Sequence, residues 1–134
     1  QMNFFDAELL KNGETYSVKL YDKVFPISEE KQAKLREHGA AAGAVTLGVR
    51  PEHIMLCAPD AAESVAATVD VSEMMGSSIH LHVNTSGKDV VLVISTVDLP
   101  EDHRFGFRFG ENVNFTFGSN VIHVFDKESG KALT

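Results

Sequence analysis

Short strand-like segments bounded by turn residues recur along the whole chain, and they constrain the fold more than any other feature. Residues 15–20 alternate, with Tyr16, Val18 and Leu20 on one face and polar side chains on the other. Asn12-Gly13 is a strong signal for a tight turn between two strands. Strands are expected over residues 3–10, 15–20, 43–49, 65–74, 79–83, 90–94, 112–117 and 121–125. The pattern predicts a mostly β fold, either a small sandwich or a barrel.

Two of the expected strands carry specific face assignments. In residues 65–74 the apolar side chains of Val65, Ala67, Val69 and Val71 are expected on one side. In residues 79–83 the apolar positions Ile79, Leu81 and Val83 are expected to face the core. His80 and His82 then share the opposite, hydrated face, an interpretation that we favour over a metal site because no further ligand motif accompanies them.

One helix is expected, over about residues 28–39. Ser28 can cap its first turn, and Glu29 and Glu30 suit the positive end of the helix dipole. Gly39 is a typical residue for ending a helix. The span is polar, which places the helix on the surface.

Length, charge and cysteine content limit the class of protein. The 134 residues predict one domain, or two very small β units that share a core. The net charge of −7 argues against binding nucleic acid, because phosphate contacts require clustered cations. The lone Cys57 lies in an apolar stretch, so it is expected to be an inert thiol in a reducing compartment.

Motifs for catalysis and nucleotide binding are absent from the sequence. A phosphate-binding loop requires GxxxxGK followed by Ser or Thr. The Gly-Lys pairs at residues 87–88 and 130–131 are followed by Asp89 and Ala132, and neither has the upstream glycine. Ser77 follows Gly76 but lacks the second glycine of a nucleophile elbow. We therefore predict no catalytic residue, no metal site and no cofactor within this chain.

Residues 105–110 read Phe-Gly-Phe-Arg-Phe-Gly and form the most unusual segment. Phe105, Phe107 and Phe109 would lie on one face of a strand. Such a face can belong to the core, contact another protein or stack on bases. The acidic charge disfavours base stacking. We favour the core, with a protein interface as the second interpretation.

The segment Gly48-Val49-Arg50-Pro51-Glu52-His53-Ile54 is the most specific motif. Pro51 is expected to end the preceding strand. Arg50 and Glu52 are placed to form an ion pair that fixes the bend, with His53 adding a polar contact. From these residues alone, the motif is a structural feature that ends the strand and bends the chain, and it indicates no function.

The heptapeptide resembles the signature of the TOBE domain, the C-terminal domain of maltose-type and glycerol-phosphate-type ABC transporter ATPases. Other segments resemble that domain in the same order along the chain. They are residues 2–5, residues 69–77 with the turn at Gly76-Ser77, residues 79–81, residues 122–126, Gly130 and Leu133. The Phe-rich segment departs from the family pattern.

This resemblance implies a single OB-fold-like, MOP-like domain over residues 1–134, excised from the C-terminal part of a longer ATPase subunit. It implies that Arg50, Pro51, Glu52, His53, Gly76 and Ser77 have structural or interface roles. It further implies a regulatory module of a bacterial sugar importer that forms a homodimer and contacts its own ATPase domain, the membrane subunits and in some members a regulatory protein. ATP and Mg²⁺ would belong to the missing ATPase domain, and the complex would lie on the cytoplasmic face of the cell membrane.

A second function stays open from the sequence. Related TOBE-type domains bind oxyanions such as molybdate, and the backbone amides of Gly76, Ser77 and Ser78 lie at a turn where they are placed to donate to one. The negative net charge of the chain disfavours binding of an anion. An OB-type oligonucleotide binder is the third interpretation and is the one that the charge disfavours most.

Overall fold

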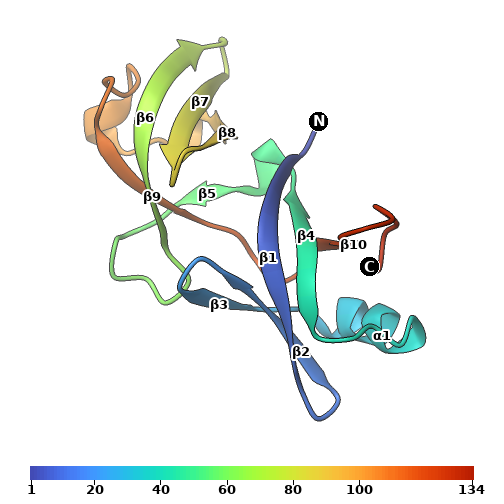
Figure 1. Cartoon of the computed structure of the whole chain (residues 1–134). Coiled ribbons are helices and arrows are strands. Elements are labelled where there is room, and N and C mark those ends of the chain that lie inside the picture. The colour runs from blue at the N-terminus through green and yellow to red at the C-terminus, as the bar shows by residue number, and fades with distance from the viewer. The chain divides into compact units, whose positions relative to one another are not determined.

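The computed structural model describes residues 1–134, and its chain is mostly β, as predicted (Figure 1). The chain divides into two compact units. We call residues 2–49 with 117–134 the helical unit, and residue 1 with residues 50–116 the groove unit. Each unit contains its own five-stranded sheet and is described by itself.

The sheet of the helical unit is antiparallel and has the strand order β10-β4-β1-β2-β3. The Asn12-Gly13 turn joins β1 to β2 as predicted, and Gly13 has the positive φ of 63° that such a turn requires. The strands are β1 (Asn3–Asn12), β2 (Thr15–Leu20), β3 (Lys23–Pro26), β4 (Gly43–Val49) and β10 (His123–Asp126). The short strand β3 was not predicted.

Gly48 in β4 lies against the side chains of Met2 and Phe125. A Cβ at this position would collide with the sulfur of Met2 and would lie 2.9 Å from the ring of Phe125. That ring makes an edge-to-face contact with Phe4, at 5.8 Å between centroids. The missing side chain of Gly48 therefore leaves room for Met2 and for the Phe125 ring.

The helix α1 (Glu29–Glu37) lies within the range that the sequence predicts. Ser28 takes the N-cap position without a side-chain hydrogen bond, and Gly39 ends the helix with a φ of 58°. The expectation of a surface helix is wrong for one face, because Lys31, Gln32 and Leu35 are buried. Because Gln32 is polar, the hydrophobic pattern of the sequence does not reveal that this face is buried.

Gln32 supplies hydrogen bonds to the backbone of β2. Its Oε1 accepts from the Tyr16 N–H at 2.7 Å, and its Nε2 donates to the Tyr16 carbonyl at 2.8 Å and to the Ile27 carbonyl at 3.2 Å. The amide side chain therefore pairs with Tyr16 as another strand would. Tyr16 itself is buried, and its hydroxyl donates to the Ala40 carbonyl at 2.7 Å.

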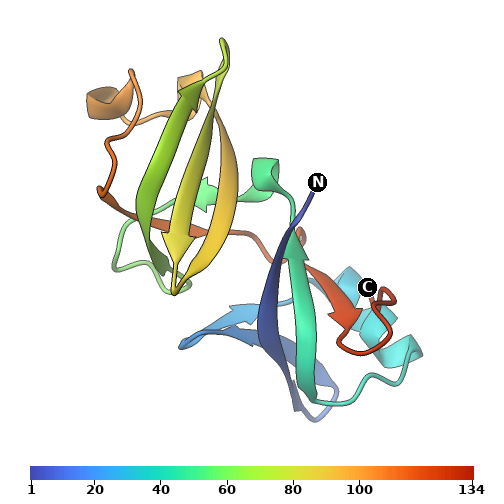
Figure 2. The same cartoon turned by 45° about the horizontal axis from the view of Figure 1, so that its top comes forward.

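The sheet of the groove unit is also antiparallel and has the order β5-β9-β6-β7-β8. Strands β6, β7 and β8 run side by side as a curled meander (Figure 2). The strands are β5 (Met55–Leu56), β6 (Val65–Met74), β7 (Ser78–Thr85), β8 (Lys88–Ser95) and β9 (Asn112–Thr116). The short edge strand β5 was not predicted. Three single turns of 3₁₀ helix accompany the sheet: η1 (Pro51–His53), η2 (Thr96–Asp98) and η3 (Glu101–His103).

Alternation fixes the core of the groove unit, with one exception. Ile79, Leu81 and Val83 are fully buried as predicted, and His80 and His82 lie on the other face of β7. The expectation that Val71 shares the buried face of Val69 is wrong, because Val71 is 51% exposed. A β-bulge between Val69 and Val71 shifts the register and turns the following side chains over.

Helices long and apolar enough to cross a bilayer are absent; the longest, α1, has nine residues.

Replacement of Gln32 by alanine tests the pairing of α1 with β2. The variant would leave the backbone of Tyr16 buried without partners, so the free energy of unfolding should fall by about 1–3 kcal/mol. Both tyrosines, Tyr16 and Tyr21, lie in the helical unit, and the chain has no Trp. Urea unfolding followed by tyrosine fluorescence therefore reports on this unit alone.

The matched control for this experiment is Lys34→Ala, an exposed position on the same helix. It should change the stability little, since alanine is the best helix former. Equal stability of Gln32→Ala and wild type would show that the amide contributes nothing.

Candidate functional site

The backbone alone shapes the turn at the Arg-Pro-Glu-His motif. Pro51 is buried at the first position of η1, and the His53 N–H donates to the Arg50 carbonyl at 3.0 Å. The side chains of Arg50, Glu52 and His53 are exposed. No ion pair joins Arg50 to Glu52, so the expected pairing is wrong. The bend is held instead by the proline and by burial of Ile54, which is 2% exposed.

The Gly76-Ser77 turn is attached to the end of β8. Gly76 has a φ of 79°, and the Met75 N–H donates to the Ser78 carbonyl at 2.8 Å. The Ser77 carbonyl accepts from both the N–H and the hydroxyl of Thr96, at 2.9 and 3.1 Å. These bonds bring the β6–β7 turn against η2.

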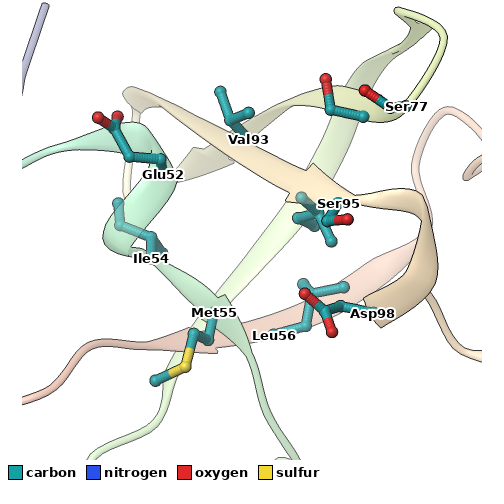
Figure 3. Close-up of a pocket in the computed structure, with 10 residues that line it drawn as sticks. Glu52, Ile54, Met55, Leu56, Ser77, Val93, Ser95 and Asp98 are labelled. Atoms are coloured by element: carbon teal, nitrogen blue, oxygen red, sulfur yellow. The ribbon is translucent and has the colours of Figure 1, made fainter.

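The two motifs singled out in the sequence meet at one groove (Figure 3). It has a volume of about 670 Å³, within the range of about 300–1,000 Å³ that is usual for ligand sites. Glu52 contributes from η1, and Ser77 contributes from the β6–β7 turn. The lining residues are Glu52, Ile54, Met55, Leu56, Ser77, Ser78, Val93, Ile94, Ser95 and Asp98.

The groove is lined by apolar side chains and three serines, and two carboxylates lie at its rim. Ile54 and Ile94 are buried, whereas Met55 is 54% exposed. Glu52 and Asp98 are exposed, and Figure 3 shows their carboxylates on opposite sides of the groove. No lining residue carries a positive charge. Such a groove suits an apolar or cationic ligand better than an anion.

The Phe-rich segment is irregular, and the expectation of a strand there is wrong. Phe105 is 87% exposed and Phe109 is 84% exposed, so the preference for the core is wrong for both rings. The physical reason lies in Gly106, which has a φ of 109° and packs against the Ser72 hydroxyl. Phe107 is half-buried, and its N–H donates to Ser72 Oγ at 3.1 Å.

A clamp centred on His103 holds this segment, and sequence reasoning missed it. His103 Nδ1 lies 3.0 Å from Asp102 Oδ1, and Nε2 contacts Glu111 Oε2. The imidazole stacks on Phe107 at 4.2 Å between ring centroids. Contact with Glu111 raises the pKa of His103, and hydrogen bonds from the Arg108 N–H and from His103 lower the pKa of Glu111. The adjacent Asp102-His103 pair was the only local signal.

The remaining candidate residues lie in surroundings that favour a structural role over a reactive one. Burial raises the pKa of the Cys57 thiol, which agrees with the expectation of an inert cysteine. His82 Nε2 lies 2.8 Å from Glu73 Oε1 on the hydrated face of β7. Nowhere in residues 1–134 do three or more His, Cys, Asp or Glu side chains gather as a metal ion would require.

The fold and groove define a small OB-fold-like β module with an apolar groove and an acidic rim. Comparison with known families shows to which protein family the chain belongs. The sequence matches the TOBE domain over residues 47–125 and the MalK OB fold domain over residues 1–54. The chain belongs to the TOBE domain family, as its motifs predict. The match to the TOBE domain contains both motifs at the groove and the Phe-rich segment.

Several curated relatives are named as import ATP-binding proteins. The sn-glycerol-3-phosphate import ATP-binding protein UgpC of Ruegeria pomeroyi is 33% identical over 101 residues, covering 75% of this chain and 26% of the relative. The oligosaccharides import ATP-binding protein MsmX of Bacillus subtilis is 27% identical over 132 residues, covering 96% of this chain and 33% of the relative. The chain thus spans about a quarter to a third of their length.

A solved structure supports the fold class. The molybdate-bound crystal form of the cytoplasmic molybdate-binding protein ModG superimposes with a TM-score of 0.67 and covers 91% of this chain and 94% of its own. Its sequence identity is 14%, so the similarity concerns the fold alone.

Substitutions at the motif should show whether the bend is stabilised by exposed side-chain contacts or by burial in the core. Arg50→Ala should change the free energy of unfolding by less than about 0.5 kcal/mol, because the side chain is exposed and unpaired. Ile54→Ala should cost about 2–5 kcal/mol, since it leaves a cavity in the core. Urea unfolding followed by far-UV circular dichroism measures both. A loss at Arg50 as large as that at Ile54 would reverse this interpretation.

The His103 clamp predicts a pH-dependent stability. A raised pKa in the folded state means that the contribution of His103 is complete below about pH 6.5 and is lost as pH rises through the folded pKa. The lowered pKa of Glu111 means that its contribution is complete above about pH 4.5 and is lost at lower pH, as pH falls through that pKa. The difference in urea midpoint between wild type and His103→Gln should therefore be largest between about pH 4.5 and 6.5 and shrink at alkaline pH. His53→Gln, at an exposed position, is the control, and a difference that is independent of pH would contradict the clamp.

Proposed function

We propose that this chain is the regulatory and dimerisation module of the ATP-binding subunit of an ABC sugar importer. The observation that carries the proposal is the pair of family matches, TOBE domain and MalK OB fold domain, which together extend over residues 1–125. Relatives named as import ATP-binding proteins support it, since they align with most of this chain.

In this proposal the chain itself does not hydrolyse ATP. Gly87 lies in the tight turn between β7 and β8, and Lys88 begins β8. A phosphate-binding loop instead leads into a helix, whose N-terminal amides receive the phosphate. ATP and Mg²⁺ belong to an ATPase domain outside this chain, and no cofactor is required within it.

The proposed partners are a second copy of the module, its own ATPase domain, the membrane subunits of the importer and a regulatory protein. The complex would act on the inner, cytoplasmic face of the cell membrane. The mechanism is allosteric, because contacts that differ between two states of the importer bias the ATPase cycle without any chemistry in the module.

The Phe-rich segment is the surface that we propose for the second copy. Phe105 and Phe109 are almost fully exposed, and two exposed aromatic rings within one short segment favour burial against another protein. Arg104 and Arg108 alternate with these rings, and Asp102 lies next to them in the chain. A segment with both signs of charge can pair with itself across a two-fold axis.

Binding of an oxyanion is the weaker alternative. The similarity to ModG concerns the fold, and the groove next to the Gly76-Ser77 turn carries Glu52 and Asp98 without a cation. Two carboxylates repel an anion such as molybdate.

The test is to isolate the native protein that contains this sequence, with an antibody raised against the chain. We expect a polypeptide roughly three times as long as residues 1–134, on the lengths of the relatives. It should hydrolyse ATP, co-purify with membrane proteins and recover a differently tagged second copy of itself. Phe105→Ser with Phe109→Ser should lower the recovery of that second copy.

The matched control is Val97→Ser, because Val97 is as exposed as Phe105 but lies outside the Phe-rich segment. A native protein no longer than this chain and without ATPase activity would refute the proposal. Equal recovery of the second copy by all variants would refute the proposed role of the Phe-rich segment.

A further inference from the structure

The groove lies between the two edges of one sheet. In the order β5-β9-β6-β7-β8, β5 and β8 each have a strand neighbour on one side only. Leu56 of β5 and Val93 and Ser95 of β8 all line the groove. η1 packs against β8, so the part of that edge that borders the groove is the segment near its end, Val93 to Ser95.

The register of β8 shows which backbone groups turn away from the sheet. The Thr96 N–H donates to the Ser77 carbonyl at 2.9 Å, and the register continues as Ser78 opposite Ser95 and Ile79 opposite Ile94. In an antiparallel ladder, hydrogen-bonded and non-hydrogen-bonded pairs alternate. Ile94 therefore bonds to β7, whereas the N–H and carbonyl groups of Val93 and Ser95 point away from it, along the open edge.

The same argument applies to β5. The Cys57 N–H donates to the Asn114 carbonyl at 2.9 Å, and the register places Leu56 opposite Phe115. Leu56 thus lies in a non-hydrogen-bonded pair, and its backbone groups turn away from β9. Unpaired backbone groups along the edge of a sheet are a template for another strand.

Side chains around the groove define the chemistry of such a strand. Leu56 and Val93 are partly exposed and offer apolar contacts, and Glu52 and Asp98 place a carboxylate on each side. A segment that brings apolar side chains between two cations would satisfy both features. The same groove of a second copy is a poor candidate, because it also carries Glu52 and Asp98 without a cation.

We propose that this groove binds an extended, positively charged peptide segment of a partner protein by β-strand addition to β8. The segment pairs its backbone with Val93 and Ser95, packs alternate apolar side chains on Leu56 and Val93, and places a Lys or Arg near Glu52 and another near Asp98. This inference rests on the proposed function, in which the module works by contacting other proteins. It specifies the chemistry of one partner.

The probe is a fluorescein-labelled peptide with the sequence Lys-Val-Thr-Val-Thr-Lys, and binding is measured by fluorescence anisotropy at low salt. The wild-type chain should bind it, and added salt should weaken the complex, because the rim charges are exposed. A peptide with Glu in place of both Lys residues should bind at least about tenfold more weakly. Equal binding of the two peptides, or no binding at millimolar concentration, would overturn the proposal.

Backbone pairing is tested by nuclear magnetic resonance on the wild-type chain. The amide protons of Val93 and Ser95 should shift and become protected from exchange when the peptide binds. Those of Leu92 and Ile94, which already bond to β7, should change little. A peptide N-methylated on its backbone should bind at least about tenfold more weakly, since it cannot donate to β8. Shifts confined to other parts of the chain would overturn the assignment.

Two sets of variants separate the edge from the rim. Val93→Pro removes the outward N–H of β8 and keeps an apolar side chain at this position, a substitution that edge strands tolerate, and it should weaken binding about tenfold. Glu52→Gln with Asp98→Asn should weaken binding similarly and flatten its dependence on salt. Asp60→Asn, a carboxylate of the same unit outside the groove, is the matched control.

If Val93→Pro fails to fold, the N-methylated peptide decides the same point on the wild-type chain. Failure of this inference is distinct from failure of the proposed function. If the native protein has ATPase activity but its groove does not bind the peptide, only the inference is refuted. A native protein without ATPase activity whose groove binds the peptide refutes only the proposed importer subunit.

Discussion

The alternation of buried and hydrated side chains along β7 and β8 fixes the register on which the groove depends. Three apolar side chains of each strand are fully or nearly fully buried: Ile79, Leu81 and Val83 of β7, and Val90, Leu92 and Ile94 of β8. A slip of one residue would expose every one of them, so the pairing is strongly specified. The same register determines that Val93 and Ser95 turn their backbone groups away from the sheet. Core packing therefore sets the chemistry of an exposed edge.

Carboxylates are used in two opposite ways within the groove unit. At His103 the two flanking carboxylates, Asp102 and Glu111, contact both ring nitrogens, which favours the charged imidazole and fastens the Phe-rich segment. At the groove, Glu52 and Asp98 form no ion pair and remain exposed. Charges of the first kind hold the fold together. Those of the second kind are free to select a ligand by its charge.

Much of the fold could be predicted from the sequence, because its signals are local. Turn glycines such as Gly13 and period-two alternation along residues 79–83 specify strands from neighbouring residues alone. The bulge that exposes Val71 could not be predicted, since it depends on pairing with a strand remote in sequence. The burial of Gln32 depends in the same way on a long-range contact, with Tyr16.

The candidate site was harder to predict than the fold. The motif around Pro51 was found, but the expected pairing of Arg50 with Glu52 does not occur, because a 3₁₀ turn points both side chains to solvent. The sequence could not reveal that Glu52 and Ser77 border the same groove. Their meeting depends on β8, which brings the end of the meander back against η1. The Phe-rich segment does not form the predicted strand, because Gly106 takes a positive φ that strands do not use.

The family relationship and the groove lead to the same kind of function by independent routes. Membership of the TOBE domain family follows from sequence and requires no groove. The groove follows from sheet edges and charge and requires no family. Apolar side chains beside unpaired backbone groups at a sheet edge are unfavourable to leave solvated. They are explained if a segment of another protein covers them, and contact with other proteins is also what the proposed function requires of the chain.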